Sequence, residues 1–96
     1  MGEAAVRDAY DIGAKIAVQV GENKRIPDGI NEALGTLSEV KNVAYQGLTS
    51  QLRDYLQYAQ SEALAFDLYL RPTTQVSGPL QSAIDCGLIC RIDIPQ

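Results

Sequence analysis

The chain has 96 residues, of which 46% are hydrophobic and 21% are charged, so length and composition predict one globular domain and leave no room for a second. Twelve acidic residues against eight basic ones give a formal net charge of −4, the opposite of the basic surface expected of a nucleic-acid-binding protein. The sequence has no apolar run as long as a transmembrane helix, and its N-terminus lacks the basic-then-apolar order of a signal peptide. Neither of these segments is therefore predicted.

The first expected element is a helix from about Glu3 to Val20, because apolar residues recur there at helical spacing. Gly13 lies in this stripe, where it allows a neighbouring element to approach closely, and Gly21 ends the helix. The stripe comprises Val6, Ala9, Gly13, Ile16, Ala17 and Val20. Two strands are expected next, near residues 25–33 and 36–43. A short turn around Gly35 would fold the first strand back against the second.

A second helix is predicted over residues 49–63, with Thr49 or Ser50 as its N-cap. Residues 65–71 alternate apolar and polar side chains, which is typical of a half-buried strand. The apolar side of the helix carries Leu52, Tyr55, Leu56, Ala59 and Ala63. The helix and the strand that follows it indicate that helices and strands alternate along this part of the chain.

The C-terminal part of the chain is expected to contain a short helix and a last strand. Ser77 can cap the helix, which ends at Gly87, and the strand covers residues 88–94. The complete predicted order is α-β-β-α-β-α-β. This order favours a single three-layer α/β domain with a mixed β-sheet flanked by helices.

The two cysteines, Cys86 and Cys90, do not define a metal site, because a structural zinc site needs four ligands and the chain has no histidine. A helix end and a strand four residues apart rarely offer the geometry of a disulfide. We therefore expect both to be packed thiols.

The most informative motif pairs Asp28, which follows a proline, with the Glu39-x-Lys41 sequence, and ten residues lie between the two acids. Residues two apart on a strand point the same way, so Glu39 and Lys41 share a face with the apolar residues Leu37 and Val43. Charges are rarely placed on such a stripe without partners. The predicted turn would bring Asp28 beside Glu39.

Two carboxylates on neighbouring strands offer the oxygen ligands that Mg2+ prefers, with water and a substrate phosphate in the other positions. The metal would lower the pKa of a bound water and offset negative charge in the transition state. Lys41 would orient that water or contact the scissile phosphate. The motif therefore predicts metal-dependent phosphodiester cleavage, with Asp28 and Glu39 as metal ligands. The alternative is a surface pair of Glu39 and Lys41 beside a turn residue.

Three further stretches carry a resemblance to a known family, namely Gln51-x-x-x-Tyr55, Arg71-Pro72-Thr73-Thr74 and residues 77–83. With these, the chain resembles PD-(D/E)xK nucleases, and most closely the restriction-fold toxin domains at the C-terminal ends of bacterial polymorphic toxins of the contact-dependent and Rhs types. The match runs from about residue 24 to the end, with Gly2-Glu3-Ala4 as a weaker match at the start. It implies a minimal restriction-endonuclease-like core, and a single nuclease domain over residues 1–96 that forms the C-terminal part of a larger secreted protein.

The resemblance also implies roles for residues outside the central motif. Gln51 and Tyr55 would back the active site, with Gln51 in contact with the catalytic lysine or the substrate and Tyr55 in contact with the substrate. Tyr55 also fits the apolar side of its helix. Glu3 would be a third metal ligand, or an acid that complements the dipole of the first helix. Arg25 and Arg71 would bind substrate phosphate through their guanidinium groups, although Arg71 also suits a surface position at a strand end.

The implied function is a toxin that hydrolyses phosphodiester bonds with Mg2+ or Mn2+, with DNA as the expected substrate. It would act in interbacterial competition, reach the target-cell cytoplasm as part of a larger effector, and be neutralised by a cognate immunity protein. An RNase or tRNase with the same site is the alternative enzyme, and an inactive nuclease-fold binding module is the alternative that the acidic charge favours. The short spacing between the acids leaves no insertion for reading bases and predicts cleavage without sequence specificity.

Overall fold

The structure is a computed structural model that describes residues 2–95, and its centre is a four-stranded mixed sheet with strand order β3-β4-β6-β8. Strand β3 is antiparallel to β4, whereas β4, β6 and β8 are parallel to one another. The strands are β3 (Gly29–Asn31), β4 (Thr36–Lys41), β6 (Ala65–Leu70) and β8 (Cys90–Asp93). Parallel neighbours need a crossover connection, and helices α2 (Ser50–Ser61) and α3 (Gly78–Asp85) provide it.

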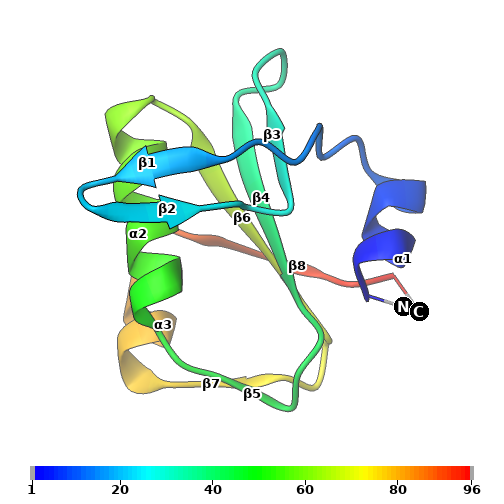
Figure 1. The fold of residues 1–96 in the computed structure, drawn as a ribbon. Coiled ribbons are helices and arrows are strands. Elements are labelled where there is room, and N and C mark those ends of the chain that lie inside the picture. Colours follow the sequence, from blue (N-terminus) through cyan, green and yellow to red (C-terminus); the bar gives the residue numbers. More distant parts are fainter. Residues whose placement is uncertain (1, 96) are drawn as a thin grey trace.

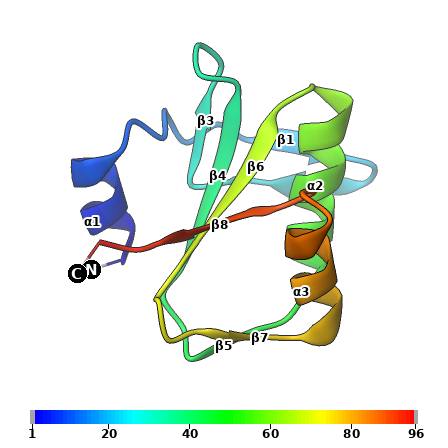
Figure 2. The same cartoon turned by 180° about the vertical axis from the view of Figure 1, so that it is seen from behind.

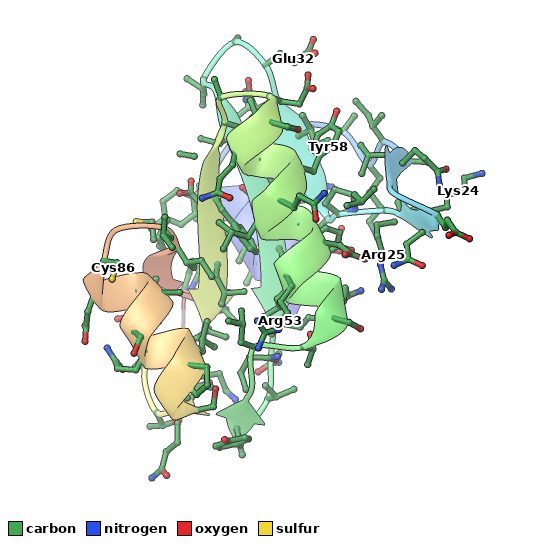
Figure 3. All side chains as sticks on the ribbon, turned by 90° about the vertical axis from the view of Figure 1, so that its left-hand side faces the viewer. Lys24, Arg25, Glu32, Arg53, Tyr58 and Cys86 are labelled. Atoms are coloured by element: carbon green, nitrogen blue, oxygen red, sulfur yellow. The ribbon has the colours of Figure 1, made fainter. Side chains whose placement is uncertain are left out.

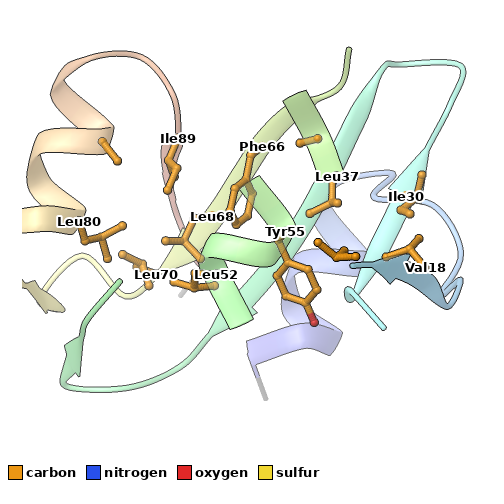
Figure 4. Close-up of a cluster of buried hydrophobic side chains, with 13 residues drawn as sticks. Val18, Ile30, Leu37, Leu52, Tyr55, Phe66, Leu68, Leu70, Leu80 and Ile89 are labelled. Carbon is orange, nitrogen blue, oxygen red and sulfur yellow. The ribbon is translucent and has the colours of Figure 1, made fainter. Parts of the chain in front are cut away.

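The sheet is the middle layer of three, with α2 and α3 on one face and α1 (Gly2–Ala9) on the other (Figures 1 and 2). The larger core lies between the sheet and α2 and α3, and Figure 4 shows its aliphatic and aromatic side chains. A smaller core beneath α1 comprises Val6, Ile12, Tyr69 and Ile94. In chain order, α1 and the elements of the main sheet follow the predicted α-β-β-α-β-α-β order, and the mixed α/β fold is confirmed.

Two small strand pairs complete the fold. The hairpin of β1 (Val18–Val20) and β2 (Asn23–Arg25) turns at Gly21, whose φ is +58°, and it lies across α2 (Figure 1). Strands β5 (Tyr45–Gln46) and β7 (Gln75–Val76) form a short parallel pair. Within residues 2–95, no helix combines the length and the apolar character needed to cross a bilayer.

The predicted helix from Glu3 to Val20 is wrong beyond Ala9. After α1 the chain runs as a loop, forms a β-bridge between Ala14 and Ile30 and then enters β1. Tertiary pairing therefore overrides the helical spacing of the apolar residues. Gly13 does permit a close approach, but to β3 and not to another helix.

Two further predictions need correction. The strand expected over residues 25–33 is divided into β2 and β3, with the buried Pro27 between them, because proline cannot donate to a strand ladder. Cys86 and Cys90 are free and exposed, and so are not packed thiols. The first lies just after α3 and the second at the start of β8, which is an edge strand.

The two helix starts predicted from capping residues are confirmed. The side chain of Thr49 accepts a hydrogen bond from the Leu52 amide at 3.3 Å, and the side chain of Ser77 accepts one from the Leu80 amide at 3.3 Å. These bonds satisfy amides that a helix start otherwise leaves unpaired. The cap at Thr49 matters for function, because it places the first turn of α2 beside the end of β4.

Candidate active site

The site lies at the N-terminal end of β3, beside the part of β4 beyond Ser38 that β3 does not pair with. Ser38 is the last β4 residue paired with β3. Beyond Ser38, the Asp28 side chain forms a hydrogen bond to the β4 backbone. Asp28 Oδ2 accepts a hydrogen bond from the Val40 amide at 2.8 Å, and the Asp28 amide donates to Glu39 Oε1 at 3.1 Å. The two bonds satisfy backbone amides that a longer β3 would have paired. The structure therefore brings together the two predicted carboxylates.

Lys41 joins this cluster from the end of β4. Its Nζ atom lies 3.3 Å from Glu39 Oε2 and donates a hydrogen bond to Gln51 Oε1 at 2.6 Å. Gln51 is in the first turn of α2, next to the capped start of that helix. The predicted proximity of Gln51 to the lysine is therefore present, and the two contacts hold the ammonium group in one orientation.

The environment of the cluster disfavours negative charge on both acids. The Glu39 side chain is nearly buried, with 5% of the residue exposed. Burial first, and then the charge of Asp28, raise the pKa of Glu39 to about 7, against the opposing effect of Lys41. Burial also raises the pKa of Asp28, and the nearby Glu3 charge adds to this. Carboxylates with raised pKa values beside a lysine are typical of a functional site.

Each of the two acids keeps one oxygen free of backbone hydrogen bonds. Asp28 Oδ1 lies 3.7 Å from the Nζ atom of Lys15, and Glu39 Oε2 faces Lys41. Among residues 2–95, no group of three or more histidine, cysteine, aspartate or glutamate side chains is arranged to hold a metal ion. Two carboxylates, each with one oxygen free of backbone hydrogen bonds, fit a metal whose other positions water and a phosphate fill, which is the usual mode of Mg2+.

Lys15 and Arg7 are two residues of the site that the sequence analysis missed. Glu3 Oε1 lies 3.1 Å from Lys15 Nζ, and Glu3 Oε2 accepts a hydrogen bond from Arg7 Nε at 3.1 Å. Arg7 also donates to the carbonyl oxygens of Gly13 and Asp28. Arg7 and Lys15 both fall within the helix predicted from Glu3 to Val20. Such a helix would place Lys15 away from β3. Gly13, whose φ is +84°, is the residue in this segment that could have indicated a loop in place of a helix.

Tyr55 is a core residue of α2. It is 1% exposed, and its ring packs edge-on against Phe66 with 6.3 Å between the ring centroids (Figure 4). Burial, with a further contribution from the charge of Glu39, raises the pKa of Tyr55 to about 12. Tyr55 therefore lies on the apolar side of α2, and its contact with substrate stays a prediction.

The two arginines predicted to bind phosphate have other partners. Arg25 Nε donates to Asp54 Oδ2 at 2.9 Å, and this pair holds β2 against α2 (Figure 3). Arg71 Nε donates to the Val43 carbonyl at 3.3 Å. Among the described residues, these contacts lie outside the cluster of Asp28, Glu39 and Lys41. The structure therefore does not bring either arginine into the cluster.

The comparisons with known proteins agree with the fold. A family model described as restriction endonuclease fold toxin 7 matches residues 1–80, a range that contains Glu3, Asp28, Glu39, Lys41 and Gln51. A search of curated proteins and a search of solved structures each found no match. The resemblance to restriction-fold toxins is confirmed by the family match, which covers most of the chain. The chain belongs to the restriction endonuclease fold toxin 7 family.

Proposed function

We propose that this domain is a metal-dependent nuclease that hydrolyses phosphodiester bonds, with DNA as its substrate. Membership of a restriction-fold toxin family supports nuclease activity and a toxic role. The observation that carries the finer proposal is the pair of Asp28 and Glu39, each with one oxygen available at the open edge of β4. A lysine stands beside each of these oxygens.

Asp28 and Glu39 would hold Mg2+ or Mn2+, and the bound metal would lower the pKa of a water and offset charge on the phosphate. Glu3 is a third proposed ligand, since its Oε1 atom and Asp28 Oδ1 both face the ammonium group of Lys15, although among residues 2–95 the three acids do not already form a group arranged to hold a metal. Glu39 must be ionised to bind a metal, and the neighbouring Lys41 favours that form.

Lys41 would act on the substrate side of the cluster. Its ammonium group can orient the attacking water or contact the scissile phosphate, and Gln51 restricts the directions in which it points. The three-residue β3 begins directly after Asp28 and is short. This short edge supports binding to the nucleic-acid backbone and cleavage without sequence preference.

The proposal extends to the biological setting. A nuclease with little sequence preference endangers the cell that makes it, so we propose that a cognate immunity protein blocks this site. We also propose that the domain, residues 1–96, is carried by a larger secreted effector, enters the cytoplasm of a target bacterium and serves in interbacterial competition. The family description of a toxin supports this setting.

The test is nicking of supercoiled plasmid by the purified protein with Mg2+, with EDTA, and as the Glu39→Ala variant. We expect cleavage with Mg2+ only, and none from the variant. Glu22→Ala is the matched control, because Glu22 is an exposed acid in the β1–β2 turn. Total RNA and tRNA are assayed in parallel. Full activity of Glu39→Ala would overturn the site, and cleavage of RNA alone would overturn the choice of DNA.

A further inference from the structure

Lys15 holds a position that a cation would take beside the two acids nearest to it. Its Nζ atom lies 3.1 Å from Glu3 Oε1 and 3.7 Å from Asp28 Oδ1. The latter is the one oxygen of Asp28 that accepts no backbone hydrogen bond, because Oδ2 is bonded to the Val40 amide. The ammonium group therefore lies on the same carboxylate oxygen that a metal ligand would use.

The fold places Lys15 there through a close contact of two backbone segments. A Cβ atom at Gly13 would lie 2.0 Å from the Ile30 carbonyl oxygen, and one at Gly29 would lie 2.2 Å from the Ile12 carbonyl oxygen. Such distances exclude any larger residue unless the backbone shifts. The Ile30 amide also donates to the Ala14 carbonyl at 3.0 Å. The residue next to this anchored alanine is Lys15.

The side chain of Lys15 is nevertheless free to leave. It is 52% exposed and reaches the acids from solvent, whereas the Asp28 side chain is 15% exposed. An exposed ion pair of this kind is weak and exchanges readily with water. A divalent cation that approaches Asp28 would meet one unit of positive charge at the oxygen that it must bind.

We propose that Lys15 is a displaceable counter-ion, which neutralises Asp28 and Glu3 in the metal-free protein and is expelled from Asp28 when a divalent cation binds. This inference rests on the proposed metal-dependent function. Without metal, the ammonium group of Lys15 neutralises negative charge on Asp28 and Glu3. Metal binding has to break this ion pair, so Lys15 lowers the metal affinity of the site. Lys15 is a positioning residue and takes no part in bond cleavage.

The test is calorimetric titration of the protein with Mn2+ and with Mg2+ at low ionic strength. We expect Lys15→Met to bind both ions about three- to tenfold more tightly than the unaltered chain, because no ammonium group has to be displaced. Lys15→Arg keeps the charge and should bind with nearly unaltered affinity. The control is Lys24→Met, which removes the same charge from an exposed residue of the β1–β2 hairpin (Figure 3).

Thermal unfolding without metal gives a second readout. Lys15→Met should melt at a lower temperature than the unaltered chain when metal is absent, and saturating Mn2+ should remove most of the difference. A lysine with a merely structural role would lower the melting temperature equally with and without metal and would not tighten metal binding.

The outcomes separate this inference from the proposed function. Equal metal affinities in the unaltered chain, Lys15→Met and Lys24→Met would overturn the role of Lys15 and leave the metal-dependent nuclease standing. Weaker binding in Lys15→Met would also overturn it. If the unaltered chain bound neither ion, the proposed function and the inference would both fall.

Discussion

Two clusters of acid and base contact α2, one through Asp54 and the other through Gln51, and the pKa values of their carboxylates are shifted in opposite directions. Asp54 accepts hydrogen bonds from Arg25 and Asn23, and these partners lower its pKa. Glu39 has Lys41 at a similar distance, yet its pKa is raised to about 7. The difference is burial and a second acid, because desolvation and the charge of Asp28 outweigh one lysine.

An ion pair with a basic side chain therefore does not by itself show whether the pKa of a carboxylate is raised or lowered. The Arg25 and Asp54 side chains are 26% and 16% exposed, and their ion pair connects β2 to α2. The Asp28–Glu39 cluster places two acids side by side at a nearly buried position, which costs stability that a purely structural pair would not require. A bound cation would offset this cost.

Replacing Asp28 by asparagine should lower plasmid cleavage by about 10³-fold, because the isosteric amide removes a proposed metal ligand. The change also should abolish Mn2+ binding measured by calorimetry. The matched variant is Asp54→Asn, which removes the same charge from the ion pair with Arg25 and should leave cleavage unchanged with a small decrease in melting temperature. Equal losses of activity in the two variants would erase the distinction between the clusters.

Replacing Glu39 by glutamine should stabilise the fold at pH 8 by about 2 kcal/mol while it abolishes cleavage. The pKa of Glu39 in the fold, about 7, is above its ordinary value of 4.5, so the folded chain binds an extra proton between these values. The contribution of protonated Glu39 to the free energy of unfolding is complete below pH 4.5 and is lost as the pH rises through 7. Urea unfolding at pH 4 and pH 8 measures it. A variant that is less stable than the unaltered chain at pH 8 would contradict the prediction.

Metal binding should strengthen by about tenfold between pH 6 and pH 8, because Glu39 must lose its proton before it can hold a cation. The sign follows from competition, since protons occupy the carboxylate below its pKa of about 7. Calorimetry in two buffers with different ionisation enthalpies should detect proton release at pH 6.5. Affinity that does not change over this range would show that Glu39 is not a ligand.

Replacing Gln51 by alanine should lower the cleavage rate by about tenfold and leave the Mn2+ affinity unchanged, because Gln51 holds Lys41 and does not face the two free oxygens. Gln57→Ala is the control, since Gln57 is an exposed residue of the same helix. A loss of metal affinity in Gln51→Ala would place the glutamine on the metal side of the cluster.

Local chemistry explains which parts of the fold could be predicted. The starts of α2 and α3 follow from Thr49 and Ser77, because a cap acts within three residues of itself. The shared direction of Glu39 and Lys41 follows from the two-residue period of a strand. The loop after α1 could not be predicted in this way. Its apolar residues have helical spacing, and only the bridge from Ala14 to β3 excludes the helix.

Local spacing along the chain is enough to predict the Asp28, Glu39 and Lys41 motif, Gln51 in the following helix and the succession of elements in the main sheet. The packing of distant segments is what brings Lys15 to Asp28, buries Tyr55 and pairs Arg25 with Asp54. These facts depend on contacts between segments more than ten residues apart. Such contacts are set by the packing of the whole chain, and no local pattern records them.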